Sequence, residues 1–557
     1  MSGLSDHAAS NEGTLSPGRY TWRPPRPFIS KEGSNRAPTA SRLVIASAAG
    51  RLRRLTSGVV LRVLLFVAIF SLAAVPPLDP DLWWHLANGR LMLALRGWPQ
   101  IDVYSFSAQG HPWIVHEWLA DLLMFVAYQA GGLPLLVALF AGIVVGGAVC
   151  LYLLLRGGGL HPTAAVGLTL VGVLAGSTAW GARPQLLNLL FAGILVCGLQ
   201  RYRQGRLAVW YLPPFLWLWA NVHSGFLVGV IITGLFLAGE AIDAWRTGEG
   251  MPRPRLIALA WAVLAGLALA VINPYGIQTI LFPLGTLTSP LIQSNIQEWA
   301  SPDFHSMPGI FLESILFVLL LGLATRRVRA RTSEWLIAAA LLYLALASQR
   351  HVPLFVIGVA PLAGRCAQAL LDSLASIVPS TPNRSVSVAA LRASAARPGR
   401  ANPLLLGVLN LALLLAVGGG MIAYRALPSL TPATQQLAVS TTFPVAAVDH
   451  LLALDRPVRV FNYYDYGGYA LWRLYPGGSR VFIDGRVEVY GPQIFGQYLA
   501  VNYLAGGWSD VLNRSHPDAI LLPSNHPLVT LLAKDPNWQL LERDRVATVF
   551  TRTGSAP

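Results

Sequence analysis

The feature that most limits how this chain can fold is a series of long apolar stretches that recur along most of its length. A helix needs roughly 20 apolar residues to cross the hydrocarbon core of a bilayer. About eleven stretches come near that length, and they are 59–78, 133–155, 163–180, 185–200, 207–221, 224–242, 256–272, 310–325, 333–347, 352–371 and 403–424. The sequence therefore predicts a polytopic α-helical membrane protein.

The composition agrees with this prediction and excludes several classes of protein. Only 12% of the 557 residues are charged, whereas about a quarter of the residues of a soluble domain carry charge. The net charge of +15 comes almost entirely from arginine. Because the arginines cluster between the apolar stretches, they indicate contact with anionic inner-leaflet lipid and no nucleic-acid partner. The cysteines lie inside apolar stretches, which leaves no disulfide framework; they are Cys150, Cys197 and Cys366.

The arginines also predict the orientation of the spans. The stretch 118–128 is apolar but too short to span, and it contains Asp121. If it lies along the membrane surface, most arginine-rich loops fall on the side of the N-terminus, as the tendency of basic residues to stay cytoplasmic requires. We therefore expect a cytoplasmic N-terminus and an extracytoplasmic C-terminus.

Three regions follow from these patterns. Residues 1–58 are rich in Ser, Gly, Pro and Arg and predict a disordered basic cytoplasmic tail. Residues 59–424 form the transmembrane domain, with a first outer loop at 79–132. Residues 425–557 predict a small extracytoplasmic α/β domain. Its expected strands are 458–461, 480–484, 519–522 and 546–551, and its expected helices are 492–504 and 527–532.

The first outer loop opens with the acidic segment Asp79-Pro80-Asp81-Leu82-Trp83-Trp84-His85. Two carboxylates this close could accept a proton or hold a divalent cation, Mg²⁺ or Mn²⁺. A purely structural interpretation is equally open: Asp81 would cap a helix over 82–95, and the two tryptophans would lie at the membrane interface. The rest of the loop is also dense in ionisable and aromatic residues, including His116 and Glu117.

This segment resembles the first outer loop of the GT-C superfamily of integral membrane glycosyltransferases, which use polyprenyl-phosphate-linked sugars. The resemblance extends over most of residues 59–557, since the span count and the outer C-terminal domain are also similar. It implies that Asp81, or failing it Asp79, is the catalytic base or a metal ligand. It further implies that 82–95 and 118–128 are helices lying along the membrane, and that the protein belongs to a membrane such as the bacterial inner (plasma) membrane.

A second motif lies in the outer domain, at Tyr463-Tyr464-Asp465-Tyr466-Gly467-Gly468-Tyr469. It is similar to the Trp-Trp-Asp-Tyr-Gly acceptor-recognition motif of oligosaccharyltransferases, with tyrosines in place of both tryptophans. The resemblance implies acceptor-side roles for Asp465 and Tyr466. The structural alternative is a strand followed by a Gly-Gly turn. The nearby segment Ile483-Asp484-Gly485-Arg486 is interpreted as a turn or as a strand end aimed at the membrane.

Several basic residues are predicted at the outer ends of spans. Arg183 and Arg350, the latter beside His351, could grip a lipid phosphate through paired hydrogen bonds. Snorkelling toward water is the alternative for these arginines. His223 and Glu298 lie in outer turns and are further candidates, as is His85.

These observations predict a glycosyltransferase that moves a hexosyl or pentosyl group from a polyprenyl-phosphate donor to an acceptor hydroxyl outside the cytoplasm. Asp81 would take the proton and Arg350, with Arg183, would stabilise the leaving phosphate. Alternatively, Asp79 and Asp81 would coordinate the cation. A single displacement predicts inversion at the anomeric carbon. The expected partners are the lipid-linked sugar, membrane lipid, and a glycan, lipid or protein acceptor. The rival classes are a transporter or scaffold for envelope lipid or polysaccharide, and a glycan ligase.

Overall fold

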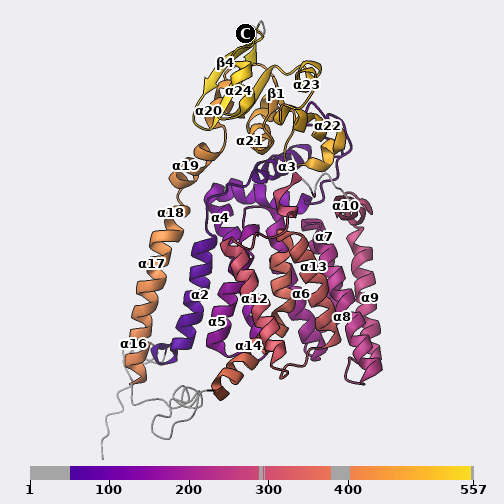
Figure 1. Cartoon of the computed structure of the whole chain (residues 1–557), viewed down its shortest axis with the longest axis vertical. Coiled ribbons are helices and arrows are strands. Elements are labelled where there is room, and N and C mark those ends of the chain that lie inside the picture. The colour runs from indigo at the N-terminus through magenta and orange to yellow at the C-terminus, as the bar shows by residue number, and fades with distance from the viewer. Residues whose placement is uncertain (1–50, 288–292, 294, 378–401, 554–557) are drawn as a thin grey trace, which may run out of the picture. The chain divides into compact units, whose positions relative to one another are not determined.

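The computed structural model describes residues 51–287, 293, 295–377 and 402–553. Most of the predicted basic tail therefore lies outside the described residues. Each predicted apolar stretch falls on a helix of the structure (Figure 1). These helices are α2 (Ser57–Ala73), α4 (Trp118–Gly157), α5 (Pro162–Ala175), α6 (Leu187–Arg203), α7 (Leu212–Val222), α8 (Phe226–Arg246), α9 (Arg253–Ala270), α12 (Met307–Ala324), α13 (Thr332–Ala347), α14 (Val352–Ile377) and α16–α18 (Pro403–Ser429).

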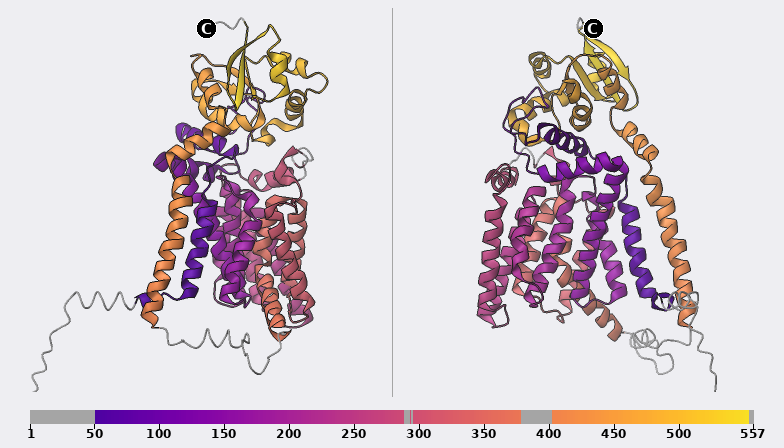
Figure 2. Two further views of the ribbon diagram at one scale, coloured as in Figure 1. Left: turned by 60° about the vertical axis from the view of Figure 1, so that its left-hand side comes forward. Right: turned by 180° about the vertical axis from the view of Figure 1, so that it is seen from behind.

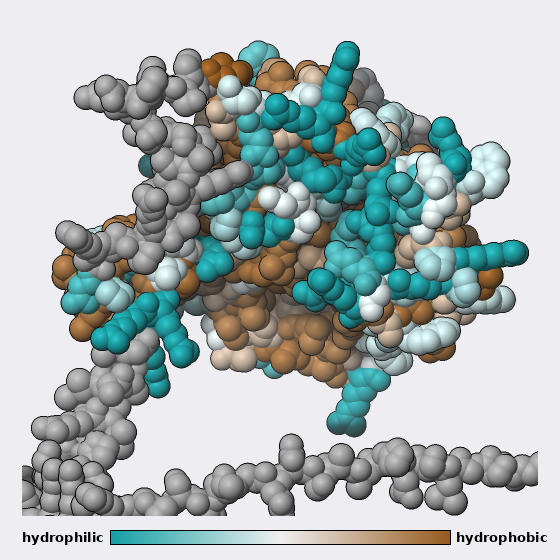
Figure 3. All heavy atoms as spheres, turned by 90° about the horizontal axis from the view of Figure 1, so that it is seen from below, coloured by the Kyte–Doolittle hydropathy of each residue, from teal (hydrophilic) through white to brown (hydrophobic). Residues whose placement is uncertain are grey.

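Six helices of the described residues are long and apolar enough to cross a membrane, and three shorter helices are apolar as well. The chain is thus an integral membrane protein with a helical bundle, while the number of eleven spans stays a prediction. Hydrophilic side chains gather on the face of the bundle turned away from the C-terminal domain (Figure 3). Near that face, the buried Glu240 of α8 pairs with Arg203 of α6 at 3.3 Å. This ion pair ties two helices together where their apolar segments end.

The ambiguous stretch 118–128 is the first segment of α4, which bends sharply before it enters the bundle (Figure 2). The bend lies at Gly131 and Gly132, and Gly132 has a φ of 63°. Glycine adopts this left-handed conformation without the steric cost that a Cβ would bring. Pro134 follows in the first turn of the second segment, where a missing N–H breaks no helical hydrogen bond. The break therefore separates an outer segment from the predicted span.

The other predicted surface helix is α3 (Asp81–Leu95). Its start differs from the expected one: Asp81 is the first helical residue and makes no capping hydrogen bond. Instead, the Asp79 carboxylate accepts the backbone N–H of Asp81 at 3.0 Å. Trp83 and Trp84 are buried, not interfacial. The Trp83 ring packs edge-on against Tyr469 at 5.0 Å, because the C-terminal domain covers this face of α3.

The C-terminal domain is built on a five-stranded sheet in the order β2-β1-β3-β5-β4. The strands are β1 (Arg459–Asn462), β2 (Arg480–Val481), β3 (Ala519–Pro523), β4 (Trp538–Arg543) and β5 (Ala547–Arg552). β1 pairs in parallel with β2 and β3, and β5 pairs antiparallel with β3 and β4. The edge strand β4 was not predicted, since its largely exposed residues show no buried apolar run.

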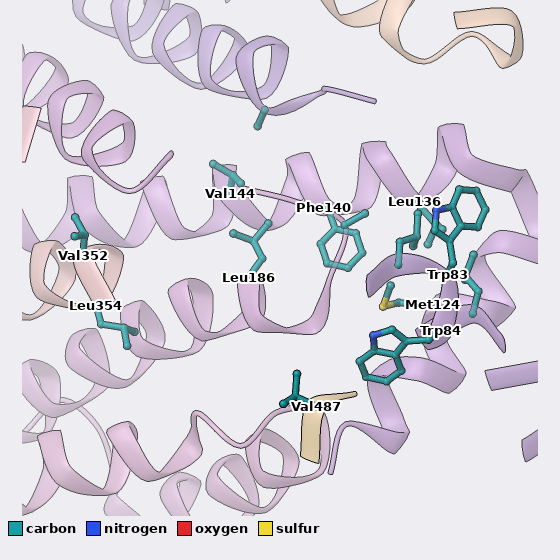
Figure 4. Close-up of a cluster of buried hydrophobic side chains, with 14 of the residues drawn as sticks. Trp83, Trp84, Met124, Leu136, Phe140, Val144, Leu186, Val352, Leu354 and Val487 are labelled. Atoms are coloured by element: carbon teal, nitrogen blue, oxygen red, sulfur yellow. The ribbon is translucent and has the colours of Figure 1, made fainter. Parts of the chain in front are cut away.

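Helices surround this sheet and join it to the bundle. They are α19 (Pro432–Thr442), α20 (Val445–Leu452), α21 (Tyr464–Leu474), α22 (Val487–Asn502), α23 (Trp508–Ser515) and α24 (Pro527–Leu532). The predicted helix 527–532 coincides with α24, and the one predicted at 492–504 lies within and just beyond α22. Buried side chains continue from the bundle to the C-terminal domain, from Phe140 through Trp84 to Val487 (Figure 4).

The tyrosine motif forms the start of α21, so the expected strand and Gly-Gly turn are wrong. Gly467 and Gly468 instead allow two close backbone contacts. A Cβ on Gly467 would lie 2.1 Å from the carbonyl oxygen of Ile483, and one on Gly468 would lie 2.4 Å from that of Pro80. The paired glycines therefore let α21 lie directly against the acidic segment that precedes α3.

Candidate active site

A cavity of about 550 Å³ lies where α3, the outer ends of the bundle helices and the C-terminal domain meet. The short helix η4 (Gln297–Trp299) and the start of α21 complete the wall of the cavity. Most residues predicted from the sequence line this cavity: Asp79, Asp81, His85, His116, Glu117, Arg183, His223, Glu298, Arg350 and Asp465. The fold thus gathers polar residues that are up to several hundred positions apart.

The two aspartates differ in their contacts. The Asp79 carboxylate lies 3.0 Å from Nε of Arg183, whereas Asp81 lies 3.6 Å from the same guanidinium. The Trp84 indole N–H donates to Asp81 at 3.1 Å. Burial, together with the charge of Asp79, raises the pKa of Asp81 to about 7. Asp81 can consequently take up and release a proton near neutral pH, as a general base must.

The two arginines also differ. Arg183 is shared among carboxylates, since it also pairs with Glu298. In the described part of the chain, Arg350 forms no ion pair with a carboxylate. Its guanidinium donates to the amide oxygen of Gln185 at 3.0 Å and stacks over the Trp299 ring at 4.7 Å. Burial, with the nearby charge of Arg183, lowers the pKa of Arg350 to about 10. Among the described residues, Arg350 is thus a charged group that faces the cavity without a direct ion pair to a carboxylate.

Histidines surround Glu117 beside the aspartates. The Nε2 atoms of His85, His116 and His223 lie 3.6, 3.4 and 3.1 Å from its carboxylate oxygens. Burial alone would raise the pKa of Glu117, but the charge of His116 and the hydrogen bond from its ring outweigh burial and hold that pKa well below its usual range. Glu117 is therefore a carboxylate throughout the neutral range.

His223 is fixed as a neutral hydrogen-bond donor. Its Nδ1 accepts the backbone N–H of Gly225 at 2.7 Å and lies 3.0 Å from the Asn188 amide nitrogen. Burial lowers the pKa of His223 to about 3. Its remaining proton must then reside on Nε2 and point at Glu117, so His223 does not present a lone pair to a metal ion.

Two sets of residues offer ligand atoms for a divalent cation. Asp79 and Asp81 fit poorly, because the Arg183 guanidinium already lies against both. His85, Glu117 and Asp121 fit better, with ligand atoms within 4.8 Å of one another. Since His85 Nδ1 contacts Asp121 at 2.6 Å, Asp121 would orient the ring while His85 Nε2 and Glu117 face the ion. A cation there would supply Lewis-acid chemistry.

Two predicted residues do not line the cavity. The Tyr466 hydroxyl donates to the backbone oxygen of Val546 at 2.9 Å, which gives it a structural contact within the C-terminal domain. His351 is buried, with its ring 6.0 Å from that of Trp299. Burial, with the charge of Arg350, lowers its pKa to about 4. His351 is therefore neutral and supports the wall behind Arg350.

Several cavity residues were missed by sequence reasoning. Tyr464 and Glu488 reach the cavity from the C-terminal domain, and Gln185 holds Arg350. Asn188 lies behind the wall and orients His223. One signal could have found Asp121: it follows Glu117 by four residues, hence on the same helix face, and it is a charge in an apolar segment. The others carry no local signal.

The segment at 483–486 has a larger role than a turn. Arg486 is completely buried and pairs with Asp484 at 2.6 Å and with Asp102 of the first outer loop at 2.8 Å. Its guanidinium also stacks over Trp113 at 4.5 Å. This cluster joins the loop to the C-terminal domain and fixes the segment that contains Gly485 against Asp81.

Gly485→Ala is expected to displace the Asp81 carboxylate and to lower the free energy of unfolding by about 1–3 kcal/mol. The added Cβ would lie 1.9 Å from Oδ1 of Asp81, so the carboxylate must move. Thermal unfolding of the purified variant tests this. Gly496→Ala is the matched control, because nothing lies within 4 Å of its Cβ position. Unfolding of Gly485→Ala at the wild-type temperature would contradict the close contact.

Comparison with known proteins adds evidence on the fold. No family model matches the sequence, and no curated protein matches it. Among solved structures, the archaeal oligosaccharyltransferase AglB from Archaeoglobus fulgidus, in complex with an inhibitory peptide and a dolichol-phosphate, is similar with a TM-score of 0.51 and 12% identity. The match covers 89% of this chain and 75% of that chain.

ArnT from Cupriavidus metallidurans bound to undecaprenyl phosphate is also similar, with a TM-score of 0.46 and 17% identity over 90% of this chain and 98% of that chain. The likeness to AglB confirms the architecture that the sequence resemblance implied. The chain shares the fold of that structure: a helical membrane bundle with a small C-terminal α/β domain beside its first loop.

Proposed function

We propose that this protein is a membrane glycosyltransferase that moves a sugar from a polyprenyl-phosphate donor to an acceptor hydroxyl on the extracytoplasmic side, with inversion. One observation carries the proposal: a half-buried arginine that forms no direct ion pair among the described residues and a carboxylate with a raised pKa face the same cavity beside the bundle. The AglB structure, which has the same fold, holds a dolichol-phosphate, and this supports a lipid-linked donor.

Arg350 would bind the donor phosphate. A guanidinium offers paired N–H groups that match two phosphate oxygens, and a charge already desolvated gains more from an anion than an exposed one does. As the glycosidic bond breaks, negative charge grows on the leaving phosphate, and a fixed cation stabilises that charge. Arg183 would assist less, because Asp79 and Glu298 already neutralise it.

Asp81 would take the proton from the acceptor hydroxyl as it attacks the anomeric carbon. Asp79 and Glu298 are both held by Arg183, so neither carboxylate is free to act as the nucleophile of a double displacement. Single displacement inverts the anomeric carbon. Asp465 and Glu488 lie on the C-terminal side of the cavity, where the acceptor would enter.

The proposed setting is a bacterial inner membrane, with residues 1–58 in the cytoplasm and residues 425–557 outside it. The transferred group would be a hexose or a pentose, and the acceptor a glycan, lipid or protein. A transporter, a scaffold or a glycan ligase is the alternative class. The proposed chemistry requires a base and a phosphate-binding arginine in the same cavity. A transporter or a scaffold does not need this pair.

The test is sugar transfer from radiolabelled polyprenyl-phosphate monosaccharides by the purified full chain. Wild type should transfer from one donor of a broad panel, while Asp81→Asn and Arg350→Ala should not. Arg514→Ala, at an exposed site of the C-terminal domain, is the control. Loss in Asp79→Asn with activity kept in Asp81→Asn would move the base to Asp79. Transfer from no donor would leave the transporter or scaffold class.

The pH dependence of transfer follows from the pKa of Asp81. Because that pKa is raised to about 7, the basic form is lost as pH falls below about 7. We expect kcat/KM to fall by about tenfold per pH unit on the acid side and to level off above about pH 7. Initial rates at donor concentrations well below KM measure this. A profile flat down to about pH 5 would contradict a base with this pKa.

A further inference from the structure

A second groove, of about 880 Å³, lies on the other side of α3 from the cavity. It is formed by α3, the bend of α4, α19 and α21. Its floor is aromatic and aliphatic, with Trp83, Tyr128 and Trp472 among its residues. None of the residues that line it is acidic, and two are arginines, Arg90 and Arg473.

The two arginines are held differently. The Arg90 guanidinium stacks over the Trp472 ring at 4.0 Å and donates to the Trp472 backbone oxygen at 2.8 Å. Within the described ranges it forms no ion pair with a carboxylate. Arg473 pairs with Asp449 at 2.7 Å, but both side chains are substantially exposed, so the pair is weak and can exchange. The groove therefore has a net positive charge over an apolar floor.

The groove also lies where the bundle meets the outer domain. Leu133, on its lining, begins the second segment of α4 just after the bend, and α19 directly follows the last apolar helix (Figure 1). Leu437 on the α19 side is 64% exposed, which is costly in water but not beside acyl chains. An amphiphile could thus place its head group beside Arg90 and its chains toward the bundle.

We infer that this groove binds an anionic glycerophospholipid of the outer leaflet, with its phosphate on Arg90 and its acyl chains on the apolar floor. Basic pockets at the edge of a helical bundle recognise lipid head groups in this way. The site is separate from the cavity, since neighbouring residues of α3 face the two: Trp84 lines the cavity and Trp83 lines the groove. A bound lipid would also join α3 to α19 and α21.

The experiment is native mass spectrometry and thermal unfolding of the purified full chain titrated with phosphatidylglycerol. We expect Arg90→Gln to weaken phosphatidylglycerol binding about five- to tenfold and to abolish the lipid-induced rise in Tm. Arg425→Gln is the matched control, an exposed arginine on the helix that leads into α19. It should bind as wild type does.

Ser440→Trp is the second variant, since it fills the groove from exposed α19 without touching the Arg90 contacts. Ser440→Trp should also lose phosphatidylglycerol binding. The proposal can therefore still be tested if Arg90→Gln misfolds. Equal protection by free glycerol phosphate would overturn a lipid site, as would unchanged binding in both variants. Asp81→Asn and Arg350→Ala should bind phosphatidylglycerol normally, so failure of the proposed transfer activity would remain distinguishable. Displacement by polyprenyl phosphate would mean that the groove belongs to the donor.

Discussion

Arg350→Ala is expected to lower the rate of sugar transfer by about 100- to 1,000-fold. The guanidinium faces the cavity and forms no ion pair with a carboxylate among the described residues. Gln185 and Trp299 already orient it. Its stabilisation of the leaving phosphate therefore requires no reorganisation during the reaction. Single-turnover rates at saturating donor measure the loss, because they separate the chemical step from binding and product release.

Two comparisons sharpen this prediction. Arg350→Lys keeps the charge but not the planar pair of donors, so its rate should fall between those of wild type and Arg350→Ala. Gln185→Ala removes one contact that orients the guanidinium and leaves the charge, and should cost less than Arg350→Ala. An Arg350→Ala rate within a few-fold of wild type would show that the donor phosphate binds elsewhere.

Arg486→Ala should have the largest effect on stability, about 3–5 kcal/mol. The substitution leaves Asp102 and Asp484 buried at 0% exposure without their cation. Asp484 would still accept the Tyr490 hydroxyl at 2.5 Å and the backbone N–H of position 486 at 3.0 Å, and Asp102 would keep its bonds from Ser105. These hydrogen bonds do not replace the positive charge that the two buried carboxylates lose. Thermal unfolding followed by intrinsic fluorescence, with limited proteolysis of the C-terminal domain, measures the loss.

An exposed ion pair of the same domain provides the control. His450 and Glu542 lie 3.5 Å apart with half-exposed side chains, so Glu542→Ala should cost about 0–1 kcal/mol. Replacing Arg486, Asp102 and Asp484 together by apolar residues should cost less than Arg486→Ala, because no unpaired charge then remains. If Arg486→Ala unfolds at the wild-type temperature, the cluster does not hold the loop to the domain.

The bundle and the general position of the site could be predicted from the sequence. Apolar stretches indicate helices because each apolar residue of a span gains free energy in lipid and the helix satisfies its backbone hydrogen bonds internally. Both effects can be read from a short stretch of sequence. The candidate site in the first outer loop was also indicated by local information, because Asp79 and Asp81 lie close together in the chain. The strands β1 and β3 were likewise visible as short apolar runs.

Other features were decided only by long-range contacts. The tyrosine motif is a helix because its glycines allow α21 to approach Pro80, and β4 pairs at the sheet edge without a buried run of its own. The resemblance placed Asp81 before Asp79, but the residues alone could not choose between a base and a pair of metal ligands. Burial and the unequal distances to Arg183 distinguish them in the structure.

The sequence by itself determined that this protein is a membrane bundle with a polar first loop, because hydrophobicity acts residue by residue. Only the tertiary structure decided which charges are paired. Arg183 and Arg350 look alike in the sequence, yet Arg183 pairs with Asp79 and Glu298, whereas Arg350 pairs with no carboxylate among the described residues. Electrostatic energy depends on distance and burial, which the fold sets by joining segments far apart in the chain.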